Sequence, residues 1–186
     1  AIRIPNNINE RIANAVDFFW KTRSGQISKQ NSFGMRDQGN RGAVTGGKQL
    51  DGFVELIFDL LVLNGVPERC IYTNSNLELP GYYRPNKKWD LLVVDGGELI
   101  IAIEFKSQVG PSFGNNFNNR TEEAMGSALD LWTAYREGIF GKQNAPWLGY
   151  FMVLEDCIKS TEPVRVRSPH FDVLEEFVDA SYKERY

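Results

Sequence analysis

Apolar residues recur with the period of an α-helix in three long stretches of the chain. These stretches predict helices over residues 7–22, 50–63 and 121–138, and a shorter apolar pattern predicts a fourth helix over residues 171–177. Asn64-Gly65 follows the second stretch, and such a pair is a common signal for the C-terminal end of a helix.

Short apolar runs predict β-strands at residues 70–73, 91–94, 99–103 and 147–154. Because the strands are interleaved with helices, the pattern predicts an α/β fold with a central mixed sheet, an antiparallel hairpin and flanking helices. No internal repeat or low-complexity linker divides the 186 residues, so we expect a single domain.

Charged residues flank the two neighbouring apolar runs at 91–94 and 99–103. Asp90 precedes the first run, and Glu104 and Lys106 follow the second with one residue between them. Side chains two residues apart share a face of a strand, so Glu104 and Lys106 emerge together. A carboxylate on so apolar a strand is costly unless it is paired or bound to a cation. Magnesium fits, because it takes oxygen ligands and leaves positions to water and phosphate, and Asp90 and Glu104 are the candidate pair.

The length of the loop between these strands decides whether the two carboxylates can meet. A two-residue loop at Asp95-Gly96-Gly97-Glu98 would set Asp90 opposite Ile103, on the wrong face. A three-residue loop with a glycine bulge would set Asp90 opposite Glu104, so we expect the longer loop or a bulge. The alternative interpretation is a solvated sheet edge with a surface ion pair.

Two segments carry groups suited to nucleic acid. Residues 21–48 hold six cations and one anion, a net charge of +5, together with six glycines, which is typical of a loop that wraps a phosphate backbone. An Asn-rich run follows the strand-breaking residues 109–114 and can donate to base edges. The candidate DNA-binding residues are Arg36, Arg41, Lys48, Lys87, Lys88, Asn115, Asn116, Asn118, Asn119 and Arg120. The alternatives are a mobile solvated loop for the basic segment and a simple turn for the Asn run.

The stretch from Trp89-Asp90 to Glu104-Phe105-Lys106 resembles the catalytic hairpin of the PD-(D/E)XK nucleases, with Trp89 in place of the usual proline. More specifically, residues 104–123, 128–138 and 146–151 are similar to the XhoI family of type II restriction endonucleases.

This resemblance implies a restriction-endonuclease-like core and a homodimer that cuts double-stranded DNA with Mg²⁺ at CTCGAG, leaving 5′ overhangs. Asp90, Glu104 and Lys106 inherit the catalytic roles, and the Phe105 backbone carbonyl joins the two carboxylates as a metal ligand. Nucleases of this fold often draw another acid from the preceding helix. Glu55 is the candidate here, with Asp51 and Asp59 in reserve.

Composition limits the other possibilities. The net charge is −3, and the two cysteines and one histidine indicate neither a zinc site nor a His-His metal cluster, so we expect free thiols in a reducing cytoplasm. No nucleotide-binding motif is present, and no apolar stretch is long enough to span a membrane. The chain starts at Ala1 rather than Met, so the native protein can continue at either end. Two rivals remain: a structure-selective repair or recombination nuclease, and a catalytically vestigial DNA-binding module.

Overall fold

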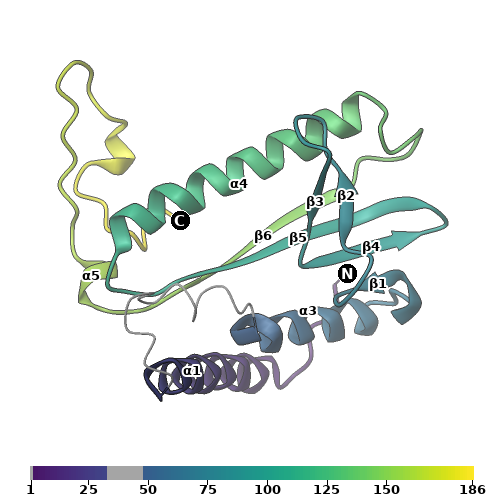
Figure 1. Ribbon diagram of the computed structural model, residues 1–186, viewed down its shortest axis with the longest axis horizontal. Coiled ribbons are helices and arrows are strands. Elements are labelled where there is room, and N and C mark those ends of the chain that lie inside the picture. Colours follow the sequence, from purple (N-terminus) through teal and green to yellow (C-terminus); the bar gives the residue numbers. More distant parts are fainter. Residues whose placement is uncertain (1, 33–47) are drawn as a thin grey trace. The chain divides into compact units, whose positions relative to one another are not determined.

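The structure of the chain is a computed structural model that describes residues 2–32 and 48–186 (Figure 1). Arg36 and Arg41, two of the predicted DNA-binding residues, lie outside the described residues. The chain forms two compact units, one made of residues 1–77 and 88–102, and the other of residues 78–87 and 103–186. In the described part, no helix is long and apolar enough to cross a membrane.

The first unit contains two helices that lie side by side (Figure 1). Helix α1 (Ile8–Ser32) extends ten residues beyond the predicted end, and α3 (Asp51–Leu63) follows the short 3₁₀-helix η2 (Lys48–Leu50), close to the predicted bounds. Phe19, which is buried, meets Phe53 edge to face with 6.5 Å between ring centroids. This aromatic contact joins the apolar stripes that predicted the two helices.

Short strands of the same unit follow the helices. The 3₁₀-helix η3 (Glu68–Cys70) leads into β1 (Ile71–Tyr72), which pairs antiparallel with β4 (Leu91–Asp95) and sets Ile71 opposite Val93. Leu91, Leu92 and Val93 are almost fully buried, as the apolar run predicts. The predicted strand at 70–73 is therefore present but shorter, because Cys70 belongs to η3.

The turn between β4 and β5 (Glu98–Gln108) has two residues, so the predicted longer loop or bulge is wrong. Gly96 and Gly97 have φ values of 58° and 86°. Positive φ at both central positions is the geometry of a type I′ hairpin turn, which glycine adopts without steric cost. Extending this register would place Asp90 opposite Ile103 rather than Glu104. Asp90 itself precedes β4, in a bend.

The second unit contains the end of β5, helix α4 (Phe113–Arg136) and strand β6 (Trp147–Leu154), with α4 lying along β5 and β6 (Figure 1). The Glu155 N–H donates to the Gln108 carbonyl at 2.9 Å, so β5 and β6 finish at the same end and run parallel. The hydrogen-bonded order is β1-β4-β5-β6, a mixed sheet. The predicted α/β class with a mixed sheet and flanking helices is confirmed.

A separate two-stranded sheet, which the apolar pattern did not predict, precedes β4 along the chain. It pairs β2 (Glu78–Pro80) with β3 (Asn86–Lys88) and has the turn 81–85 at its tip. These strands are only three residues long and contain mostly polar or proline residues, so neither period nor hydrophobicity marked them.

Helix α4 starts at Phe113, eight residues before its predicted start, so that predicted boundary is wrong and the Asn-rich run lies within the helix. Asn115 to Asn119 form its first turns. Phe113 stacks on Tyr182 at 6.0 Å, and Phe117 packs on the same ring at 5.7 Å, which anchors this segment as helix. Packing against the distant C-terminal residues thus outweighs the weak helix propensity of asparagine.

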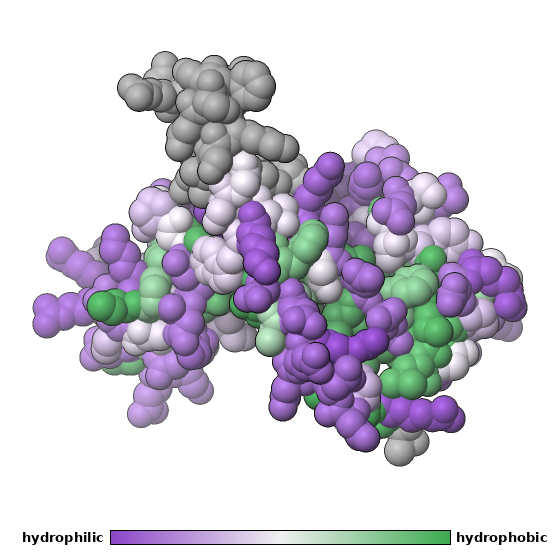
Figure 2. All heavy atoms as spheres, turned by 90° about the horizontal axis from the view of Figure 1, so that it is seen from below, coloured by the Kyte–Doolittle hydropathy of each residue, from purple (hydrophilic) through white to green (hydrophobic). Residues whose placement is uncertain are grey.

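The C-terminal residues of the second unit hold little regular structure. Helix α5 (Ile158–Thr161) is one turn long, and the predicted helix at 171–177 is reduced to the 3₁₀-helix η4 (Glu175–Phe177). The Tyr186 hydroxyl donates to the Gln108 side chain, which is buried at the end of β5. On the face drawn in Figure 2, hydrophilic residues surround patches of hydrophobic ones.

Candidate active site

Glu104 is a carboxylate on β5 of which only 6% is exposed. Lys87 from β3 places its Nζ 2.6 Å from Glu104 Oε2, and Lys106, two residues along β5, pairs with Oε1. Each oxygen of the Glu104 carboxylate therefore forms an ion pair with one ammonium group. Two ion pairs of this kind offset the desolvation cost that a buried carboxylate would otherwise impose.

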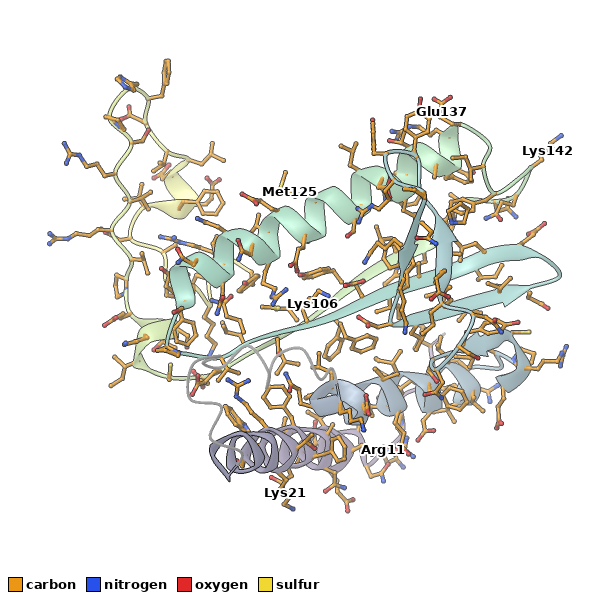
Figure 3. All side chains as sticks on the ribbon, viewed as in Figure 1. Arg11, Lys21, Lys106, Met125, Glu137 and Lys142 are labelled. Carbon is orange, nitrogen blue, oxygen red and sulfur yellow. The ribbon has the colours of Figure 1, made fainter. Side chains whose placement is uncertain are left out.

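Glu104 and Lys106 lie on the same face of β5, so this prediction from their spacing is confirmed. Figure 3 shows Lys106 on the side of β5 that faces α4. Phe105 lies on the other face, where it is buried and its ring is 5.1 Å from that of Phe151 on β6. The alternation of the strand thus separates an apolar face that packs the sheet from a charged face that lines a cavity.

That cavity has a volume of about 250 Å³ and lies within the second unit. Three cations, three acids and two small residues line it: Arg84, Lys87, Lys106, Glu104, Glu122, Glu123, Gly126 and Ser127. Cationic groups beside carboxylates make a site that can take a phosphate and a divalent cation together. The cationic groups attract the phosphate, and the carboxylates supply oxygen ligands to the metal ion.

Glu122 and Glu123 are cavity residues that the sequence did not assign to the site. Both fall in the first turn of the helix predicted over residues 121–138, where acids commonly complement the helix dipole. Because α4 begins at Phe113, both acids instead fall well inside the helix, on the stretch that reaches the cavity. Glu123 also pairs with Arg120, one turn earlier on α4.

A comparison with known protein families matches residues 29–186 to the family described as restriction endonuclease XhoI. The chain belongs to the XhoI restriction endonuclease family. The predicted family is therefore confirmed.

Three relatives agree with this assignment. The chain is 56% identical over 156 residues to the type II restriction enzyme BstVI of Geobacillus stearothermophilus, covering 81% of this chain and 70% of that enzyme. It is 52% identical over 170 residues to the type II restriction enzyme XhoI of Xanthomonas vasicola, covering 90% and 68%. For the type II restriction enzyme AbrI of Azospirillum brasilense the identity is 51%, covering 82% and 69%. No solved structure matches the chain.

Membership of the XhoI family implies a divalent metal ion, and the question is whether the cavity residues suit such an ion. Glu104, Glu122 and Glu123 line the cavity, and carboxylates are the type of ligand that Mg²⁺ takes. Both Glu104 oxygens are engaged by lysines, so an ion at Glu104 would have to displace an ammonium. Within residues 2–32 and 48–186, no group of three or more His, Cys, Asp or Glu side chains is placed to hold a metal.

The other predicted ligands lie in the first unit. Asp90 is half-buried in the bend before β4, and Glu55 is exposed on α3. The reserve acid Asp59 forms an ion pair with Arg11 at 3.1 Å. Burial raises the pKa of the other reserve acid, Asp51, against the opposing effect of Lys48.

The predicted DNA-binding residues have different surroundings. Lys48 and Lys88 are exposed, as are Asn115, Asn118 and Asn119 on α4, whereas Asn116 is half-buried. Lys87 is turned to Glu104, as described above. The backbone carbonyl of Arg120 accepts a hydrogen bond from the Tyr150 hydroxyl at 3.2 Å. Burial raises the pKa of Tyr150 well above its ordinary value, which favours the neutral phenol that donates this hydrogen bond.

Proposed function

We propose that the protein is a type II restriction endonuclease that hydrolyses double-stranded DNA at CTCGAG with Mg²⁺ and leaves 5′ overhangs. The observation that carries the proposal is the Glu104–Lys106 pair on β5, which faces a cavity lined by acids and cations in a chain of the XhoI family. Bacterial DNA lies in the cytoplasm, so we propose that location for the enzyme. A palindromic target has two-fold symmetry, which favours a homodimer with one active site for each strand.

The residues that we propose to hold Mg²⁺ are Asp90, Glu104 and the backbone carbonyl of Phe105, with Glu55 as a further candidate in the first unit. When bound, the ion would supply Lewis-acid stabilisation of the scissile phosphate and lower the pKa of a water. Lys106 orients the attacking water or stabilises the negative charge that develops on the phosphate oxygens. Glu122 and Glu123 are additional candidate ligands, because they line the same cavity as Glu104.

Lys87 has a place in this proposal beyond contact with the DNA backbone. Its ammonium holds Glu104 Oε2, so together with Lys106 it fixes the orientation of the carboxylate. A phosphate entering the cavity competes with Glu104 for this ammonium. Lys87 would then pass to the phosphate and leave one carboxylate oxygen accessible to the cation.

The remaining predicted DNA contacts support recognition rather than hydrolysis. Arg36, Arg41, Lys48 and Lys88 supply positive charge, and Asn115, Asn116, Asn118, Asn119 and Arg120 supply donors for base edges or phosphates. Arginine to guanine and asparagine to adenine are the pairings that the chemistry favours. Placing the Asn run on a helix gives its exposed members fixed spacing along one surface.

The second candidate function is a DNA-binding module without catalytic activity. The double pairing of Glu104 favours it, because lysines already occupy both oxygens of the expected metal ligand. This alternative and the nuclease differ in one respect that experiment can decide: both bind DNA, but only the nuclease hydrolyses it when a divalent ion is added.

The test is incubation of the full chain with a plasmid that carries one CTCGAG site, in Mg²⁺, in Ca²⁺ and in chelator. A plasmid with this site altered by one base pair is the matched substrate, and Glu104→Gln is the matched protein. We expect one linear product with Mg²⁺, only from the unaltered plasmid and only with the wild-type chain. Binding without cleavage would support the inactive module, and cleavage of both plasmids would indicate a structure-selective or unspecific nuclease.

A further inference from the structure

The turn of the β2–β3 hairpin holds two adjacent aromatic side chains in solvent. Tyr82 is 48% exposed and Tyr83 is 65% exposed, and their rings meet edge to face with 5.0 Å between centroids. Exposed neighbouring tyrosines at a turn contribute little to a core, so their apolar area is available to a partner. Figure 1 shows this turn beside α4.

A buried carboxylate on α4 fixes the backbone of this turn. Asp130 is 3% exposed, and its Oδ1 accepts the backbone N–H groups of Tyr82 and Tyr83 at 2.9 and 2.8 Å. Its Oδ2 accepts Arg84 Nε at 2.9 Å. Three charge-assisted hydrogen bonds to one carboxylate hold a short turn whose two tyrosines are exposed and are not packed in a core.

Gly81 allows the backbone of the turn to lie close to Asp130 on α4. A Cβ at this position would lie 2.6 Å from Asp130 Oδ2 and 2.8 Å from the Arg84 carbonyl oxygen, which is closer than real contacts allow. Any larger residue would therefore push the turn away from α4. The glycine and the buried acid together indicate that the position of the turn is specified, and is not simply that of a loose loop.

The turn adjoins the candidate active site through its own residues. Arg84 follows the two tyrosines directly and lines the cavity that contains Glu104, as does Lys87 on β3. Residues 78–88 hold three cations, Arg84, Lys87 and Lys88, against one acid, Glu78. The hairpin thus has the sign of charge that a phosphate backbone attracts, and it continues the wall of the cavity.

We propose that the turn 81–85 is a DNA-contacting finger, in which Tyr82 and Tyr83 pack against the duplex beside the phosphate that enters the Glu104 cavity. Asp130 is its positioning residue. The inference rests on the proposed nuclease function and adds an aromatic contact to it. Tyrosine suits this role, because its ring packs on sugars and base edges and its hydroxyl donates to phosphate oxygens. Two such rings on a fixed turn would contribute to affinity with little loss of conformational entropy.

The first test measures binding of the full chain to a duplex containing CTCGAG, in Ca²⁺ and without cleavage. The double substitution Tyr82→Ala/Tyr83→Ala should weaken binding about tenfold. The matched variant Tyr82→Phe/Tyr83→Phe keeps the rings and should lose much less affinity. Neither variant should shift the thermal midpoint appreciably, because both side chains are largely exposed.

The second test locates the contact. A benzophenone amino acid in place of Tyr83 should give a covalent product with the duplex on irradiation, whereas the same group in place of the exposed Phe171 should not. Crosslinks to a second copy of the chain instead of DNA would overturn the inference and identify a protein interface. Wild-type cleavage with unchanged binding by the double alanine variant would overturn the finger while the nuclease function stands. Failure of the wild type to bind or cut would refute both.

Discussion

Lys87 Nζ lies 2.6 Å from Glu104 Oε2, although the two residues are 17 positions apart and belong to different sheets. Both side chains are largely buried. A carboxylate that carries Lys87 on one oxygen and Lys106 on the other is an anion surrounded by cations, and a divalent ion has to compete for it. The proposed catalytic chemistry therefore depends on what releases a lysine from Glu104.

Replacing Lys87 with methionine removes this competitor and keeps most of the side-chain volume. We expect Mg²⁺ to bind the DNA-free Lys87→Met protein about fivefold more tightly than the wild type, because the ion no longer displaces an ammonium. Calorimetric titration measures the affinity directly. Lys142→Met, at an exposed lysine visible in Figure 3, is the control and should leave the affinity unchanged. Equal affinities in all three proteins would refute competition between Lys87 and the ion.

Asp90→Asn tests the predicted partner of Glu104. If Asp90 is a metal ligand, the rate of Mg²⁺-dependent cleavage should fall at least about a hundredfold, because the charge stabilisation of the transition state depends on the ion. DNA binding in Ca²⁺ should change little, since affinity resides mainly in cationic contacts. Asp95→Asn, at the exposed end of β4, is the control. Normal cleavage by Asp90→Asn would transfer the role to the other acids, and Glu122→Gln and Glu123→Gln would then be compared.

Asp130→Asn should loosen the hairpin turn. The substitution keeps one acceptor oxygen but turns an amide group or a neutral oxygen toward Arg84, so a charge-assisted bond is lost inside the protein. We expect the free energy of unfolding to fall by about 1–3 kcal/mol and amide exchange at Tyr82 and Tyr83 to accelerate.

The matched control for Asp130 is an ion pair in solvent. Asp156 lies 3.5 Å from Lys183, and both side chains are more than half exposed. Asp156→Asn should therefore cost no more than about 0.5 kcal/mol. Equal losses of stability for the two variants would show that Asp130 does not anchor the turn more strongly than a surface pair does.

The phenol of Tyr186 should make the stability of the folded protein depend on pH in the alkaline range. Burial raises its pKa to about 12, with Arg120 opposing and Glu123 reinforcing the shift, compared with the ordinary value of 10.0. The folded protein therefore favours the neutral phenol. This contribution is fully present below pH 10 and is lost as the pH rises from 10 to 12.

Urea unfolding at pH 9 and pH 11 tests this sign. Wild-type stability should fall more between these two pH values than the stability of Tyr186→Phe, which has no phenol to ionise. Absorbance titration of the phenolate supplies an independent reading, because one tyrosine that titrates near pH 12 should be missing from the variant. Parallel loss of stability in both proteins would contradict the predicted contribution of Tyr186.

Local sequence could predict the elements whose signals are contained within a few residues. The apolar runs of β4 and β5, the stripe of α3 and the run at 147–154 predicted their elements within a few residues, because period and burial act over short distances. The Gly96-Gly97 pair was also a local signal, for a type I′ turn. A longer loop would bring Asp90 and Glu104 onto one face, but the glycine pair forms a two-residue turn.

The sequence by itself determined the family, the α/β class and the placing of Glu104 and Lys106 on one strand face, since strand alternation needs no distant partner. Only the tertiary structure decided that α4 begins at Phe113, that Lys87 holds Glu104, and that Asp130 fixes the hairpin turn. Each of these depends on contact between segments 17 to 69 positions apart, such as Phe113 with Tyr182 or Asp130 with Tyr82. No local pattern encodes such contacts, because their energies appear only after the chain has packed.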